Sequence, residues 1–296
     1  MRPQLRPGLQ VLRRDVHTLQ LGLDWPGVVV LEDSPALQAV LRAIDGIRDV
    51  AAVVMTAARQ AGVAESSCRA ALEALIDCGA VVDQAQHLRG SVTEPAWAAT
   101  WLLAGPAGGA PDLAAAKDAH ALHVVGSGQV ADGVRALAAR HDVRLAGSSA
   151  DVLVVASDHE PSRDVSDRVM ADGRPHLWAV VRELVGVLGP FVQPGDTACL
   201  RCVDRSRARH DPAWPTLVES AAGRPGHVHA CDPVLASLIA IWAVQEVSVW
   251  MSGLRPQTLG RTIEVPVGVG VVEAEHHLAH PACGCGWSWS HDTMGA

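Results

Sequence analysis

Four cysteines in two close pairs have the spacing of ligands for a single metal ion. Cys199 and Cys202 are separated by two residues, and Cys283 and Cys285 by one. Both pairs lie among Gly and Pro residues, which favour turns. Four thiolates fill the tetrahedral shell of zinc and leave no position for a catalytic water. The sequence therefore predicts a structural zinc ion that joins two distant segments.

Disulfide bonds are the alternative use of these thiols. Cys283 and Cys285 are too close in sequence for an easy mutual bridge, and the residues after Met1 do not resemble a secretion signal. We therefore expect a cytoplasmic protein that binds zinc at the two pairs. Cys68 and Cys78 are expected to be core thiols of one predicted helix.

A glycine-rich loop is the second feature with chemical potential. A predicted strand over 121–125 runs into Gly126-Ser-Gly128-Gln-Val-Ala131, and a helix is predicted to follow through residue 139. This Gly-x-Gly-x-x-Ala form directs a helix N-terminus at a phosphate group. The alternative is that the glycines only let the helix and the strand pack closely. A second strand, over 152–156, ends in Ser157-Asp158 and continues a parallel α/β pattern.

Cys231 is a candidate nucleophile. It stands in His227-Val-His229-Ala-Cys231-Asp-Pro233, at a predicted helix start where the helix dipole stabilises a thiolate. The neighbouring Asp232 has the opposite effect, because a nearby carboxylate raises the pKa of a thiol. The histidines at 276, 277 and 280 are a weaker metal candidate, and beside a complete four-cysteine site we interpret them as a solvated loop.

Composition excludes two classes of partner. The 296 residues are 49% hydrophobic and carry a net charge of −8, and Lys117 is the single lysine. A nucleic-acid partner requires a dense basic face, so none is expected. The apolar run over 234–251 contains Gln245 and Glu246 and predicts a buried helix rather than a membrane span.

The elements that position these residues divide into two domains. The N-terminal part reads as three strands, over 9–14, 18–23 and 28–31, followed by three helices that start near Ser34, Val50 and Ala64. A Gly- and Pro-rich stretch over 105–111 then predicts a linker. We expect an N-terminal domain over 1–92, a linker over 93–118 and an α/β domain over 119–296.

The order of motifs in the second half resembles the ThiF-type, ubiquitin-activating-like superfamily. The resemblance rests on the glycine loop, the strand that ends at Asp158, the segments 188–202 and 211–215, and His280-Pro-Ala-Cys-Gly-Cys-Gly286. More narrowly, the chain is similar to the actinobacterial branch described as cyclodehydratase-associated or leader-peptide-binding. The resemblance implies a Rossmann-type α/β domain with a structural zinc site. It also implies an N-terminal PqqD-like winged helix (β3α3) that recognises a peptide.

The resemblance also implies a nucleotide site, formed here by Gly126, Gly128 and Asp158. The family supplies an Arg, a Gln and a Lys from a stretch that follows the second strand, and Asp158 matches its magnesium-binding aspartate. That stretch is missing, because only residues 147–150 separate a predicted strand over 143–146 from the next one. Lys117 lies before the glycine loop. We therefore interpret the site as vestigial and expect no ATP cofactor.

These observations lead to one functional hypothesis and two alternatives. We expect a non-catalytic protein that binds a leader peptide and presents it to a partner enzyme in ribosomal peptide modification. The first alternative is an ATP-dependent adenylyltransferase or sulfur-carrier-activating enzyme that uses Asp158 and Cys231. The second, transcriptional regulation, is disfavoured because the helix over 64–78 carries Arg69 as its only basic residue.

The resemblance places the peptide beside the third N-terminal strand and the last N-terminal helix. The strand would offer Val28, Val29, Val30 and Leu31, and the helix would offer Cys68, Arg69, Leu72 and Leu75. Such strand addition takes affinity from main-chain hydrogen bonds. The alternative is that the α/β domain, or a second subunit of a homodimer, already covers this edge.

Overall fold

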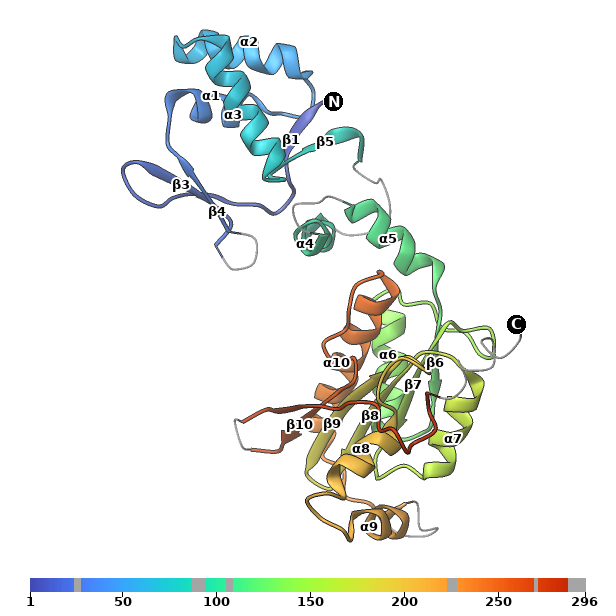
Figure 1. Cartoon of the computed structure of the whole chain (residues 1–296). Coiled ribbons are helices and arrows are strands. Elements are labelled where there is room, and N and C mark those ends of the chain that lie inside the picture. Colours follow the sequence, from blue (N-terminus) through green and yellow to red (C-terminus); the bar gives the residue numbers. More distant parts are fainter. Residues whose placement is uncertain (24–27, 87–93, 105–108, 223–227, 269–270, 287–296) are drawn as a thin grey trace, which may run out of the picture. The chain divides into compact units, whose positions relative to one another are not determined.

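The structure is a computed structural model, and it describes residues 1–23, 28–86, 94–104, 109–222, 228–268 and 271–286. The chain divides into an N-terminal unit, Met1–Ala115, and a C-terminal unit, Ala116–Ala296 (Figure 1). The predicted edge residue Gly27, the predicted boundary at 92 and His227 lie outside the described residues.

The N-terminal unit contains two small sheets and three packed helices. One sheet is antiparallel and is formed by β2 (Val11–Arg13), β3 (Thr18–Leu21) and β4 (Val29–Glu32), in that order, and the other pairs β1 (Pro3–Leu5) with β5 (Val81–Asp83). The helices are α1 (Pro35–Ala43), α2 (Val50–Ala61) and α3 (Glu65–Asp77), and a 3₁₀ turn covers Gln84–Gln86. The three-stranded sheet and the three helices follow the predicted order.

Local capping explains where these helices begin and end. The Ser34 side chain accepts a hydrogen bond from the Leu37 main-chain N–H, and Asp49 caps α2 in the same way. Gly62 ends α2 with φ +65°, a left-handed conformation that costs glycine little. The apolar faces of the three helices and of β3 form one core, which includes Leu21 and Val40.

Two features of the N-terminal unit differ from the predictions. The β1–β5 pair was not predicted, because each strand has only three residues. The predicted linker over 93–118 instead contains two helices, α4 (Glu94–Ala104) and α5 (Ala110–Ala119). The buried side chains of Trp97 and Trp101 pack with Ala110 and Val82, which attaches this segment to the N-terminal unit.

The C-terminal unit is built on a six-stranded mixed sheet. Its strands are β6 (Leu122–Val125), β7 (Val152–Ser157), β8 (His176–Arg182), β9 (Val185–Val192), β10 (Arg261–Pro266) and β11 (Glu273–His276), in the spatial order β11-β10-β9-β8-β7-β6. The first three strands are parallel, and the later neighbours are antiparallel. The predicted strand over 143–146 is reduced to a single bridge between Leu145 and Leu122.

Helices cover both faces of this sheet (Figure 1). The helices of the unit are α6 (Gln129–Arg140), α7 (Arg163–Asp172), α8 (Leu200–Arg207), α9 (Trp214–Ala221) and α10 (Pro233–Met251). Helices α6 and α10 pack on one face through an apolar cluster that includes Val134 and Ile239. On the other face, α7 and α8 contribute to a cluster that contains the four predicted metal ligands. The unit is therefore a three-layer α/β structure.

Helix α10 is the predicted buried helix, but only one of its faces is buried. Among the described helices it alone is long and apolar enough to cross a membrane by length and composition, and half of its apolar window is buried. Leu235, Ile239 and Val247 face the sheet, and the buried Glu246 accepts a hydrogen bond from the Thr258 main-chain N–H at 2.7 Å.

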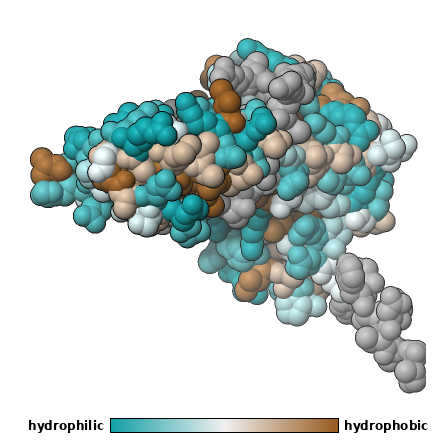
Figure 2. All heavy atoms as spheres, turned by 90° about the horizontal axis from the view of Figure 1, so that it is seen from above, coloured by the Kyte–Doolittle hydropathy of each residue, from teal (hydrophilic) through white to brown (hydrophobic). Residues whose placement is uncertain are grey.

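In the view of Figure 2 the surface is mostly hydrophilic, with hydrophobic side chains scattered among polar ones.

Candidate metal centre and nucleotide loop

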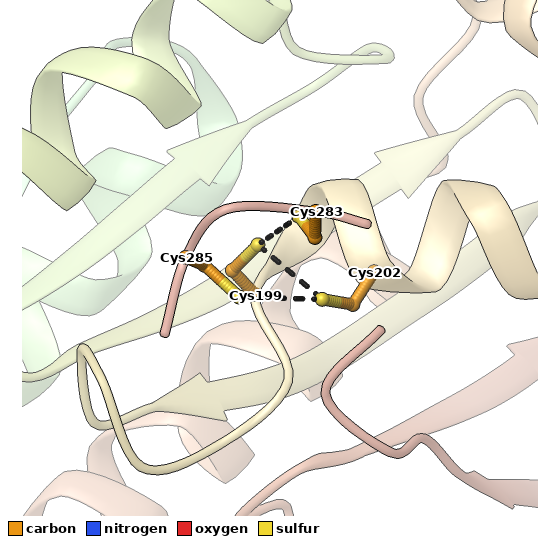
Figure 3. Close-up of side chains that lie close together, drawn as sticks. All are labelled: Cys199, Cys202, Cys283 and Cys285. Atoms are coloured by element: carbon orange, nitrogen blue, oxygen red, sulfur yellow. Dashed lines mark hydrogen bonds between the residues drawn. The ribbon is translucent and has the colours of Figure 1, made fainter. Parts of the chain in front are cut away.

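The structure brings the four predicted metal ligands together. Cys199 precedes α8 and Cys202 lies in its first turn, whereas Cys283 and Cys285 come from the turn that follows β11 (Figure 3). The Sγ atoms of Cys199 and Cys202 are 3.8 Å apart, those of Cys199 and Cys283 3.6 Å, and those of Cys202 and Cys285 3.5 Å. All four sulfurs lie within 4.8 Å of one another.

This arrangement fits a tetrahedral metal ion. A zinc–sulfur bond of about 2.3 Å places the sulfurs of a regular tetrahedron roughly 3.8 Å apart. Cys199 and Cys202 are buried, and the His280 main-chain N–H donates to the Cys202 sulfur at 3.2 Å. Such N–H···S contacts orient the thiolates of a metal site. The cluster can therefore hold a metal such as zinc.

The electrostatics of Cys199, Cys202 and Cys285 show why an ion would stabilise the cluster. A hydrogen bond from Cys199 lowers the pKa of Cys202 to about 4, and the same interaction is the main cause that raises the pKa of Cys199. Burial raises the pKa of Cys285 to about 12. The metal-free cluster therefore favours one thiolate and keeps neighbouring sulfurs protonated. A divalent cation would neutralise the repulsion between thiolates and displace those protons.

Ion pairs fix the helix that carries the first cysteine pair. Arg163, which is 8% exposed, makes a bidentate contact with Asp204 of α8, at 2.6 Å for both nitrogens. Arg201, between the two cysteines, pairs with Asp167 of α7 at 2.6 Å through two nitrogens. Bidentate pairs of this kind restrict orientation as well as distance. They hold α8 against α7 and position the first two sulfurs.

Two positions of the predicted nucleotide loop need glycine because a larger residue would collide with other parts of the protein. Gly126 and Gly128 have φ values of +110° and +102°, which disfavour other residues. A Cβ at Gly126 would collide with the Ala156 carbonyl oxygen, and one at Gly128 would lie 2.6 Å from Cγ of Asp158. The loop follows β6 and leads into α6 as predicted. Its glycines let the loop approach the end of β7.

Asp158 occupies the N-terminus of α6. Its carboxylate accepts hydrogen bonds from the main-chain N–H groups of Gln129 at 2.7 Å and of Val130 at 3.0 Å. These are the first donors of a helix that begins at Gln129, and in dinucleotide-binding loops such donors face a phosphate group. The carboxylate therefore satisfies this anion site from within the chain.

The nearby cationic side chains are directed at the protein main chain. Lys117 donates to the His141 carbonyl at 3.2 Å, and Arg135 donates to the Gly126 carbonyl at 2.7 Å. Within the described segment 141–151 the structure contains no helix, as the short spacing predicted. Both cations are thus bound to main-chain carbonyls, Arg135 to one within the loop and Lys117 to one outside it.

Cys231 lies beside Asp158 but is a poor nucleophile in this arrangement. Burial, followed by the charge of Asp158 and a hydrogen bond to it, raises the pKa of Cys231 to about 11. Asp232 caps α10 by accepting from the main-chain N–H groups of Val234 and Leu235. The thiol is therefore protonated near pH 7, in contrast to a thiolate stabilised by the helix dipole.

The histidine cluster differs from the predicted solvated loop. His277 is buried, and its Nε2 lies 2.8 Å from Oγ1 of Thr262. His276 is exposed, and Nδ1 of His280 accepts from the Ala282 main-chain N–H at 3.1 Å. Only part of this segment is solvated, because β11 brings His277 against the sheet.

The predicted peptide-binding residues divide into edge and core positions. Val28, Val29 and Leu31 are half-buried, and Val30 is 44% exposed. On α3, Arg69 is exposed, whereas three of the predicted contact residues contribute to the core of the unit and are at most 1% exposed: Cys68, Leu72 and Leu75. Their burial argues against direct contact with a peptide in this conformation.

The C-terminal unit contains a cavity of about 990 Å³ that was not predicted from the sequence. Its lining residues come from β8, β9, β10, β11, the end of α8, α9 and adjoining loops. Arg182 and Arg207 lie over the Trp214 ring, at 5.5 and 4.8 Å from its centroid. The lining residues are far apart in sequence and form no motif. The alternation Glu273-Ala-Glu275 is the one local signal of a strand with a charged face.

Comparisons with known proteins agree on the fold. No protein-family model matches the chain, and no curated protein matches it. Among solved structures, the heterocyclase TruD is 16% identical with a TM-score of 0.68, over 96% of this chain and 42% of TruD. The chain therefore spans less than half the length of that heterocyclase.

Structures of E. coli MccB match over nearly their whole length. The complex of MccB with ATP is 13% identical with a TM-score of 0.68, over 97% of this chain and 100% of MccB. The complex with selenomethionine-labelled MccA is 12% identical with a TM-score of 0.67. These similarities show that the chain shares the α/β fold of E. coli MccB and of the matching part of TruD.

Proposed function

We propose that this chain is a non-catalytic, cytoplasmic ThiF-like protein that binds a leader peptide and presents it to a partner enzyme of ribosomal peptide modification. In this proposal the three-stranded sheet and helices α1 to α3 act as a PqqD-like winged helix. Zinc at Cys199, Cys202, Cys283 and Cys285 stabilises the α/β unit. The similar fold of heterocyclases, one of them solved with substrate and cofactor, supports a role in such a pathway.

The observation that carries the non-catalytic part is the contact between Asp158 and the N-terminus of α6. An adenylating enzyme needs that helix terminus, cationic side chains and a metal-binding carboxylate to be directed at ATP. Here the carboxylate accepts from Gln129 and Val130, and Lys117 donates to a carbonyl. ATP could bind at this loop only after these contacts are broken.

The edge of β4 supports the peptide-binding part. The sheet order leaves β4 with β3 as its partner on one side among the described strands. The Asp33 main-chain N–H donates to the His17 carbonyl at 2.7 Å, and hydrogen-bonded pairs alternate along an antiparallel ladder. The main-chain groups of Val29 and Leu31 therefore face β3, and those of Val30 and Glu32 face outward. These outward groups suit the addition of a peptide strand.

Catalysis by adenylation remains the second candidate because E. coli MccB, solved with ATP, has the same fold over 97% of this chain. An enzyme of this kind would use Asp158 for magnesium and Cys231 as a covalent carrier. It would catalyse ATP–pyrophosphate exchange that depends on Asp158. The raised pKa of Cys231 and the capping role of Asp158 favour the non-catalytic proposal.

The direct test uses the full chain and the peptides encoded beside its gene. Fluorescence anisotropy with each labelled peptide should show saturable binding without nucleotide. The modifying enzyme encoded nearby should then act faster on the peptide when this protein is added. If no such peptide binds and the protein catalyses ATP–pyrophosphate exchange, the proposal is wrong and the chain is the adenylating enzyme.

A further inference from the structure

The cavity of about 990 Å³ lies where α/β proteins commonly bind ligands. Its lining includes Asp158 after β7 and Glu183 after β8, at the carboxyl ends of two parallel strands. Ligands of open α/β sheets bind in crevices outside these ends. On the opposite side the lining includes residues of the edge strand β11. The cavity is large enough for several residues of a peptide.

Charge determines which ligand this cavity can accept. Among the described residues, six carboxylates line it, from Asp158, Glu160, Glu183, Glu264, Glu273 and Glu275, against two guanidinium groups, from Arg182 and Arg207. Both arginines contact the same oxygen, Oε1 of Glu264. Arg182 also pairs with Glu160, at 3.4 Å from Oε2, and Arg163 contacts the other oxygen of that carboxylate. The ion pairs therefore involve two of the six carboxylates, and the other four leave this wall negative. A triphosphate or another anion would be repelled here.

The carboxylates nearest β11 lack a cationic partner among the described residues. Glu273 stands opposite Glu264 in the β10–β11 register, where like charges are unfavourable. Glu275 stands opposite Thr262, and its Oε1 lies 3.8 Å from Nδ1 of His277. Burial lowers the pKa of His277, so that ring is neutral near pH 7 and does not offset the charge.

Strand β11 also has main-chain groups that no other described strand pairs. It is the last strand of its sheet. The His277 main-chain N–H donates to the Gly260 carbonyl at 2.8 Å, so the alternation of an antiparallel ladder turns Glu273 and Glu275 toward β10. The N–H and C=O groups of Ala274 and His276 therefore face outward. A free strand edge thus adjoins an acidic cavity wall.

We propose that this cavity and the edge of β11 bind an extended peptide segment with Lys or Arg at alternate positions. The segment pairs through its main chain with Ala274 and His276. Because side chains alternate along a strand, every second residue faces the cavity and places a cation near Glu273 and Glu275. The charged edge also discourages pairing with neutral strands. This surface belongs to the C-terminal unit and the β4 edge to the N-terminal unit, so the inference goes beyond the proposed function.

The test measures binding of two labelled octapeptides to the full-length, zinc-loaded protein by fluorescence anisotropy. One peptide alternates Thr with Lys and the other alternates Thr with Glu. The Lys peptide should bind and the Glu peptide should not. The double variant Glu273→Gln/Glu275→Gln should weaken binding at least tenfold. A control double variant, Asp118→Asn/Glu219→Gln, removes the same charge from exposed positions outside this cavity and should bind within twofold of the wild type.

A second variant tests the strand pairing. Ala274→Pro removes a main-chain N–H that faces away from β10 and leaves the hydrogen bonds between β10 and β11 intact. Circular dichroism should therefore show an unchanged fold, and peptide binding should fall about tenfold. Val30→Pro, on the β4 edge, should leave binding of the Lys peptide unchanged, which separates this site from the proposed leader-peptide site. Equal binding of both octapeptides, or unchanged binding by the double variant, would overturn the proposal. Full displacement by equimolar spermidine would instead assign the cavity to small amines and refute a peptide ligand.

Discussion

Oδ2 of Asp158 lies 2.7 Å from the main-chain nitrogen of Gln129, so a side chain at the end of β7 caps the helix that a nucleotide-binding loop would direct at phosphate. Removing this cap with Asp158→Ala should destabilise the first turn of α6 by about 1 kcal/mol. Amide hydrogen exchange, followed by mass spectrometry, should be roughly fivefold faster in that turn. Asp118→Ala, an exposed control, should leave it unchanged. Equal exchange in both variants would contradict the capping role.

Metal analysis of the purified chain should give about one zinc per molecule. Cys199→Ser or Cys285→Ser should abolish this stoichiometry and lower the free energy of unfolding by about 3 kcal/mol or more, because metal binding is coupled to folding. Cys78→Ser is the matched control, since this half-buried thiol lies outside the cluster. A metal-free protein with an unchanged melting temperature would refute the zinc site.

Proline at Val30 should weaken leader-peptide binding about tenfold while the fold is retained. This residue directs its main-chain N–H away from β3, so the substitution removes a donor for the added strand and no ladder bond. Val11→Pro is the control, because the Gly22–Gln10 hydrogen bond directs the Val11 N–H away from β3 on the opposite edge. Binding is measured by anisotropy with the peptides encoded beside the gene. Equal losses in both variants would argue against strand addition at β4.

Stability should fall as the pH decreases from 6.5 toward 4, partly through His176. Burial lowers the pKa of His176 to about 4, so the unfolded chain binds a proton in this range that the folded chain does not. Linkage then predicts a loss of about 2 kcal/mol between pH 7 and 5. His176→Asn, which keeps a donor for the Arg174 carbonyl, should show a smaller loss by urea unfolding. A wild-type slope in the variant would exclude His176 as the cause.

Local motifs were predicted from the sequence more accurately than the surfaces that they form. The cysteine pairs and the glycine loop were located because their spacing encodes the turns. The collision that Gly126 avoids depends on Ala156, whose position only the sheet determines. Helical spacing places Cys68 and Leu72 on one face of α3, yet it does not distinguish a groove from the core that buries them. Helix α4 was not predicted either. Its tryptophans lie beside Gly and Pro residues, and the spacing of its apolar residues shows no amphipathic pattern.

The proposed absence of a functional ATP site in the C-terminal unit is tested most directly by calorimetric titration of the zinc-loaded full chain with Mg-ATP. The carboxylate of Asp158 already occupies the helix terminus, and the nearby Lys117 and Arg135 donate to carbonyl groups. We therefore predict no saturable heat below a dissociation constant of about 1 mM. Saturable binding at micromolar concentrations that is lost in Asp158→Ala would contradict the account and support an adenylating enzyme.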